Sequence, residues 1–128
     1  MSTRKDGRRL RDIEAAITAI ERHLTRGTID DELIFDACRA RLIEIGEAVK
    51  GIDPSLLARS PDVPWREIAR MRDHLTHRYF DTLHEVVADV IERDLPTLKL
   101  AVNRSRRIGA DLEAGQTTLD DASDSDDS

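Results

Sequence analysis

Aromatic residues are scarce in this chain, which has one Trp, one Tyr and two Phe among 128 residues. Proteins that read nucleic acids by stacking bases on aromatic side chains need several such residues, so the composition argues against that class. The single cysteine, Cys38, cannot form an internal disulfide, and its place in an apolar helical pattern predicts a buried core residue.

Long apolar stretches are missing as well. No run of 18 apolar residues exists, and the basic N-terminus is not followed by the hydrophobic core of a signal peptide. We therefore expect a soluble, cytoplasmic protein that makes no contact with a membrane. At 128 residues the chain has room for one compact domain and no more.

The negative charge of the chain is unevenly placed. The formal net charge is -6, but residues 111–128 hold seven acids and no Lys or Arg, which leaves 19 acids against 20 bases in the rest. The sequence therefore predicts an acidic, disordered tail over residues 110–128, a helical domain over 8–109 and a basic N-terminal arm over 1–7.

Hydrophobic periodicity predicts helices along the whole domain. Apolar residues recur at spacings of three and four over residues 10–24, and again after Asp31 as far as Val49. Asp53 followed by proline predicts the N-cap of one short helical turn. A third long helix is expected from residue 64 to 75, weakening over 76–80.

The last apolar stripe covers residues 83–91, with Asp81 as a possible cap. Pro96 then either kinks this helix or opens another, and Gly109 is expected to end the ordered region. No stretch has the two-residue alternation of a half-buried strand. The prediction is an all-α fold, an antiparallel bundle of four to five helices.

Chemically versatile side chains gather in residues 70–80, RMRDHLTHRYF, which hold two of the four histidines, three arginines and the only tyrosine. One reading is a solvated helix end whose arginines pair with Asp73 and Asp81. A metal site of His74 and His77 with Asp81 would lack a third firm ligand. No G-x-S-x-G motif supports a serine nucleophile.

Phosphodiester cleavage without a metal is the remaining reading. The 2'-hydroxyl of RNA attacks its neighbouring phosphate when a base removes the proton and a cation offsets the charge on the phosphoryl oxygens. His77 titrates near neutral pH, and the guanidinium fork of Arg72 matches phosphate oxygens. A symmetric dimer with a shared cleft would supply a second histidine.

These residues resemble a known family. Arg72, Asp73, His77 and Tyr79 match the R-x4-H-x-Y signature of HEPN toxins, in particular the HepT component of HEPN/MNT toxin–antitoxin systems. Matching segments flank the signature on both sides, and the similarity covers residues 8–104. They are RLRDI at 9–13, IGEA at 45–48, PDVPW at 61–65 and DLPTL at 94–98.

The resemblance implies a homodimeric HEPN bundle with metal-independent endoribonuclease activity, of a type VII-like system. Arg72 and His77 would be catalytic, Asp73 would help to hold the site, and no cofactor would be needed. Tyr79 matches the tyrosine that an MNT-type nucleotidyltransferase antitoxin modifies with AMP, using ATP. The alternative is a catalytically silent HEPN subunit that binds nucleotide or regulates the partner enzyme.

Gly46 and Glu47 lie within the helix predicted after Asp31. Gly46 is expected to permit close helix packing. Glu47 either pairs with an arginine of the site region or faces solvent. Trp65 is expected to anchor the following helix in the core rather than to stack a base.

Overall fold

The computed structural model describes residues 4–76 and 80–119 of the chain, and over these residues every regular element is a helix. The all-α prediction is therefore confirmed for the described part of the chain. The elements are α1 (Arg4–Leu24), α2 (Glu32–Lys50), α3 (Pro54–Leu57), α4 (Trp65–Leu75), α5 (Phe80–Asp89), η1 (Val90–Asp94) and α6 (Leu95–Leu119).

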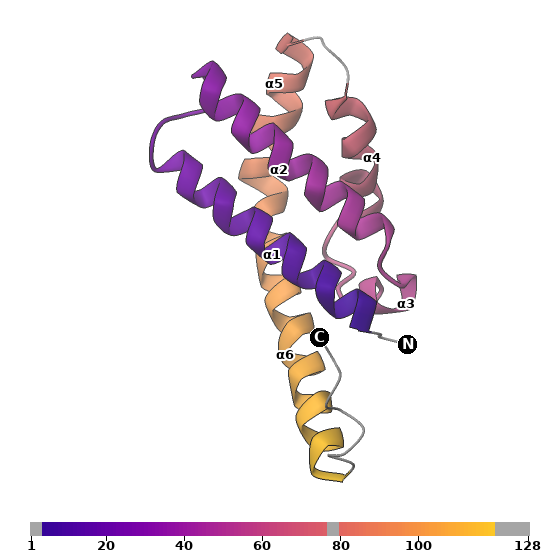
Figure 1. Ribbon diagram of the computed structural model, residues 1–128. Coiled ribbons are helices and arrows are strands. Elements are labelled where there is room, and N and C mark those ends of the chain that lie inside the picture. The colour runs from indigo at the N-terminus through magenta and orange to yellow at the C-terminus, as the bar shows by residue number, and fades with distance from the viewer. Residues whose placement is uncertain (1–3, 77–79, 120–128) are drawn as a thin grey trace.

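The helices pack side by side around α2 (Figure 1). Residues 25–31 form a short turn between α1 and α2, so these two helices run antiparallel. On its other side α2 packs against α4, while α6 packs against α1. Within the described residues, no helix combines the length and the apolar character needed to span a bilayer.

Capping residues set the helix starts where the sequence predicts them. Asp31 is the N-cap of α2, and its Oδ1 accepts a hydrogen bond of 2.8 Å from the backbone N–H of Leu33. Asp53 caps α3 in the same way, accepting from the backbone N–H of Ser55 at 2.9 Å, and Pro54 is the first helical residue. A side-chain oxygen thus satisfies a backbone donor that the first turn leaves without a partner.

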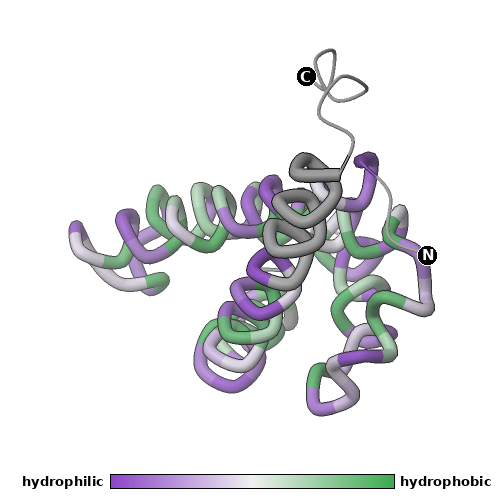
Figure 2. The backbone as a smooth tube through the Cα atoms, turned by 90° about the horizontal axis from the view of Figure 1, so that it is seen from below, coloured by the Kyte–Doolittle hydropathy of each residue, from purple (hydrophilic) through white to green (hydrophobic). Residues whose placement is uncertain are grey.

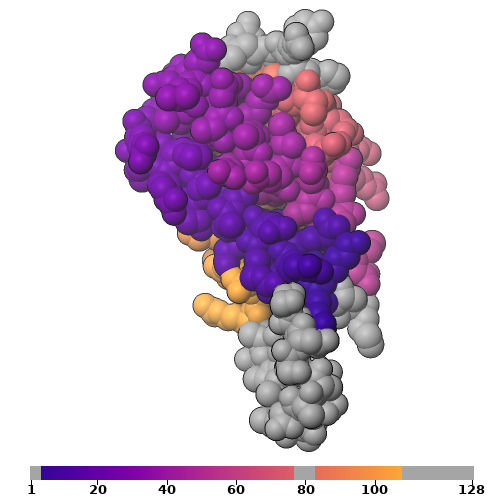
Figure 3. All heavy atoms as spheres, in the orientation of Figure 1, coloured from indigo at the N-terminus to yellow at the C-terminus, as the bar shows by residue number. Residues whose placement is uncertain are grey.

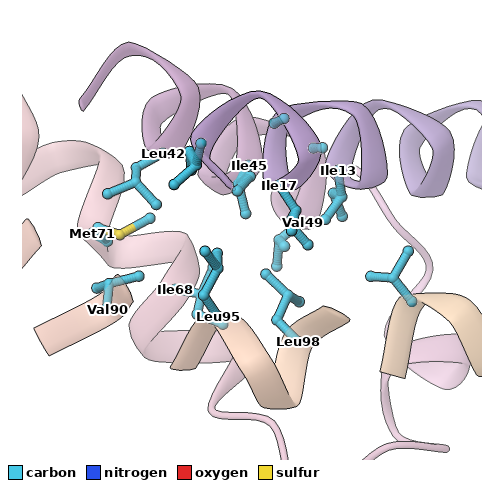
Figure 4. Packing of buried hydrophobic residues seen from close by; sticks show 14 of the residues in the cluster. Ile13, Ile17, Leu42, Ile45, Val49, Ile68, Met71, Val90, Leu95 and Leu98 are labelled. Atoms are coloured by element: carbon cyan, nitrogen blue, oxygen red, sulfur yellow. The ribbon is translucent and has the colours of Figure 1, made fainter. Parts of the chain in front are cut away.

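The core is built from the apolar stripes of α1, α2, α4 and the later helices. Figure 4 shows side chains such as Ile13, Ile45 and Ile68 pointing toward one another between the helices. Apolar and polar residues are interspersed along the helices where Figure 2 colours them by hydropathy, as expected of helices with one buried face. Each large aliphatic side chain buried in this way contributes roughly 1.5–3 kcal/mol to folding.

Two core predictions are confirmed at single residues. Cys38 is fully buried, and this burial raises the pKa of its thiol because the charged thiolate is poorly solvated there. Trp65 is half-buried against the core, and its Nε1 donates a hydrogen bond of 3.0 Å to the carbonyl oxygen of Ser60. The indole therefore fixes the loop that precedes α4.

The N-terminal helix begins at Arg4, earlier than the boundary at residue 8 that the sequence suggests. Asp6 is buried, and its Oδ1 accepts a hydrogen bond of 3.2 Å from the backbone N–H of Asp53. The guanidinium of Arg9 lies directly against Gly51, the C-cap of α2, where a cation interacts favourably with the helix dipole. These long-range contacts extend the helix into the basic segment.

A π-helical turn precedes Pro96 and resolves the choice between a kink and a new helix. The backbone N–H of Leu95 donates to the carbonyl of Val90, five residues back, where an α-helix would use the fourth. Helical structure therefore passes through the proline, which has no N–H to donate. It continues beyond Gly109, the expected end, to Leu119 (Figure 1).

Candidate active site

Arg72 lies on α4 where this helix approaches α2 most closely. Gly46 of α2 faces it, and a Cβ atom built on Gly46 would lie 3.0 Å from the Cβ of Arg72 and 3.2 Å from the carbonyl oxygen of Ile68. A methyl group there would be packed more tightly than most Cβ atoms, so α4 would have to shift by a few tenths of an ångström to accept it. The predicted role of Gly46 in close helix packing is confirmed, and it determines where the root of the Arg72 side chain sits.

Carboxylates hold the guanidinium of Arg72 from two sides. Its Nε donates a hydrogen bond of 3.0 Å to Oε1 of Glu47, and its Nη1 lies 3.5 Å from Oδ1 of Asp73. Lys50 extends the cluster, with its Nζ 3.8 Å from the same oxygen of Asp73. Glu47 therefore pairs with an arginine of the site, which decides between the two alternatives that the sequence left open.

These ion pairs orient the arginine more than they stabilise the fold. The side chains of Arg72 and Glu47 are 37% and 56% exposed, and ion pairs in such solvated positions contribute about 0–1 kcal/mol. Within the described part of the chain, Nη2 of Arg72 makes no hydrogen bond or ion pair. The arrangement leaves an oriented and accessible cationic donor, which suits a phosphate oxygen.

The end of α4 is tied down by two side chains. Thr76 donates through its hydroxyl to the carbonyl of Asp73 at 2.7 Å, and Nε of Arg39 on α2 donates to the carbonyl of Leu75 at 2.6 Å. The last carbonyls of a helix have no partner within the helix, so these bonds replace missing ones. The chain therefore leaves α4 at a defined point, directly before residue 77.

Two of the predicted site residues, His77 and Tyr79, lie outside the described residues. On the far side of this segment, His84 of α5 stacks on Phe35 of α2, with ring centroids 5.9 Å apart and planes inclined by 7°. Nε2 of His84 also lies 3.1 Å from Oδ1 of Asp30. The helices on both sides of residues 77–79 are thus anchored to α2.

Glu47, Lys50 and Arg39 are the residues around Arg72 that the sequence did not identify as a set. Glu47 follows Gly46 directly, which was the one available signal, whereas nothing local marks Lys50 or Arg39. In the ranges that the structure describes, no group of three or more His, Cys, Asp or Glu side chains is arranged to hold a metal ion.

Fold and site together define a class: a helical protein that presents an oriented arginine near the end of α4, five residues before His77 in the sequence. The model of the HepT-like family, described as "Ribonuclease HepT-like", matches residues 13–105. The chain therefore belongs to the HepT-like ribonuclease family.

Individual relatives agree with the family match. A Thermococcus cleftensis protein named "Probable ribonuclease HepT" is 38% identical over 103 residues, which are 77% of this chain and 93% of that protein. A candidate RNase of Caldanaerobacter subterraneus is 35% identical over 74 residues, or 58% of this chain and 66% of the relative. One of Methanocaldococcus jannaschii is 40% identical over 52 residues, or 41% and 43%. No solved structure matches the chain significantly.

Proposed function

We propose that this protein is a metal-independent endoribonuclease, the toxin of a HEPN/MNT toxin–antitoxin system. The observation that carries the proposal is the exposed guanidinium of Arg72, oriented by Glu47 and Asp73 and five residues before His77, in a chain of the HepT-like ribonuclease family. RNA is the substrate, and two chains form a homodimer whose facing motifs share one cleft.

The proposed reaction uses proton transfer and charge neutralisation. His77 takes the proton of a ribose 2'-hydroxyl, and the resulting oxygen attacks the adjacent phosphorus. The bond from phosphorus to the 5'-oxygen breaks, and that oxygen receives a proton from imidazolium, from the same histidine or from the partner copy. Arg72 binds the phosphoryl oxygens as negative charge gathers on them. Asp73 supports Arg72 and forms no contact with RNA.

Tyr79 is the proposed point of control. A nucleotidyltransferase antitoxin would transfer AMP from ATP to the hydroxyl of Tyr79, releasing pyrophosphate. The added phosphate would stand near Arg72 and Arg78, where it competes with the phosphate of the substrate. Incubation with the partner enzyme and ATP should add the mass of one or more AMP groups to the native chain and none to Tyr79→Phe.

The decisive experiment is RNA cleavage by the purified protein in the presence of EDTA. We expect cleavage by the native chain, loss of at least a hundredfold in His77→Ala, and full activity in His23→Ala, a matched histidine control outside the motif. Equal activity of His77→Ala and the native chain would contradict the catalytic assignment. Intact RNA in every reaction would favour the silent subunit that binds nucleotide or regulates its partner.

A further inference from the structure

An arginine-lined groove runs along the outer side of α1, apart from the Arg72 site. It has a volume of about 570 Å³ and is bounded by α1, α2 and α6. Four arginines line it, two from α1 and one from each neighbouring helix. They are Arg11, Arg22, Arg41 and Arg106. Figure 3 shows α1 and α2 next to each other on this face of the molecule.

The charges in the groove do not cancel. Arg41 forms an ion pair of 3.1 Å with Glu44, and Arg106 pairs with Glu14. Within the described residues, the guanidinium groups of Arg11 and Arg22 make no hydrogen bond or ion pair, which leaves the groove two positive charges in excess. An anionic ligand would neutralise them.

The two unpaired arginines are the first and the last residues of α1 that line the groove. Eleven residues separate Arg11 from Arg22, which is three helical turns and about 16 Å along α1, so both side chains project from the same side. Apart from Glu14, which pairs with Arg106, the lining residues between them are small: Ala15, Ala16, Thr18 and Ala19. Small side chains between two cations allow a chain of phosphates to approach the helix closely.

We propose that this groove binds the phosphate backbone of the RNA substrate at nucleotides outside the cleaved bond, an inference that rests on the proposed function. The span of about 16 Å is long enough for several consecutive phosphates of one RNA strand. None of the lining residues is aromatic, so the groove offers no platform for stacking bases. It contacts phosphates and is independent of sequence.

The groove and the Arg72 site lie on connected parts of the surface. Glu44 also lines a neighbouring hollow of about 400 Å³ that includes Asp12 and Glu47, and Glu47 binds Arg72. Because α2 separates α1 from α4, and packed helices lie about 8–10 Å apart, the α1 axis, which carries Arg11 and Arg22, lies up to roughly 16–20 Å from the α4 axis, which carries Arg72. The hollow holds three carboxylates and one cation, Arg9, so its net negative charge repels phosphate and only an RNA long enough to span this gap uses both sites.

The test compares two double variants that remove equal charge. Arg11→Ser with Arg22→Ser removes the unpaired cations of the groove. Arg59→Ser with Arg93→Ser removes two exposed arginines that line neither this groove nor the neighbouring hollow. For a single-stranded RNA of 20 nucleotides, we expect the groove variant to raise KM about tenfold at 0.15 M salt. The slope of log KM against log salt concentration should become shallower by about 1.4, because two phosphate contacts are lost.

The remaining outcomes separate this inference from the proposed function. The kcat on the 20-nucleotide RNA should stay unchanged, and cleavage of a tetranucleotide should be equal in both variants. Cleavage with identical KM and salt slope in the two variants would overturn the groove assignment, as would a groove variant whose KM rises as much on the tetranucleotide as on the 20-nucleotide RNA. If the native chain cleaves no RNA, the proposed function fails, and binding of a fluorescent 20-nucleotide RNA by the same variants still decides the groove.

Discussion

Replacement of Gly46 by alanine tests whether close packing of α2 on α4 builds the site. In a helix, alanine is favoured over glycine by about 1 kcal/mol, so an unhindered site would gain stability. Here the new methyl group would lie 3.0 Å from Cβ of Arg72 and 3.2 Å from a backbone oxygen of Ile68. Overpacking of this kind costs about 1–3 kcal/mol, which predicts a net loss of about 1 kcal/mol.

Gly7 supplies the matched control for this variant. It lies in α1, and the nearest atom to a Cβ built there is Nη1 of Arg11 at 3.8 Å, an ordinary contact. In urea unfolding at constant m, we expect Gly7→Ala to gain about 0.5–1 kcal/mol and Gly46→Ala to lose stability. The Gly46 variant should also cleave RNA more slowly, because the root of Arg72 is displaced. An equal stability gain in both variants would refute the packing argument.

Two other variants test the ion pair at the site and a helix cap. Glu47→Ala should lower kcat for RNA cleavage several-fold, because Arg72 loses its Nε partner, while the free energy of unfolding changes by less than about 1 kcal/mol. Glu47→Gln should restore part of the rate. An unchanged kcat in Glu47→Ala would contradict the positioning role of Glu47. At the N-cap of α3, hydrogen bonds from Ser55, first from its backbone N–H, lower the pKa of Asp53 to about 2 from its ordinary 3.8. The stabilisation is thus present above pH 4 and is lost as pH falls toward 2. Asp53→Asn keeps the cap, but its free energy of unfolding should change less with pH between 4 and 2. An unaltered pH dependence in this variant would argue against the assignment.

Much of the local structure followed from the sequence because its causes are local. The spacing of apolar residues predicted the helices, including the one that begins after Asp31, and Asp53 followed by proline predicted the cap of α3. The π-helical turn before Pro96 was harder to foresee, because a proline is compatible with several ways of replacing its missing hydrogen bond. The burial of Asp6 escaped prediction because its partner, the backbone of Asp53, lies 47 residues away.

The candidate site likewise combines features that the sequence predicted with features that only the tertiary structure shows. The sequence by itself determined the all-α class, the core faces and the motif that contains Arg72 and His77. Only the tertiary structure decided that Glu47 holds Arg72 and that Arg39 ties the end of α4 to α2. The physical reason is that periodicity specifies which face of a helix is buried, whereas pairing across helices depends on their separation and rotation, which the close contact at Gly46 sets.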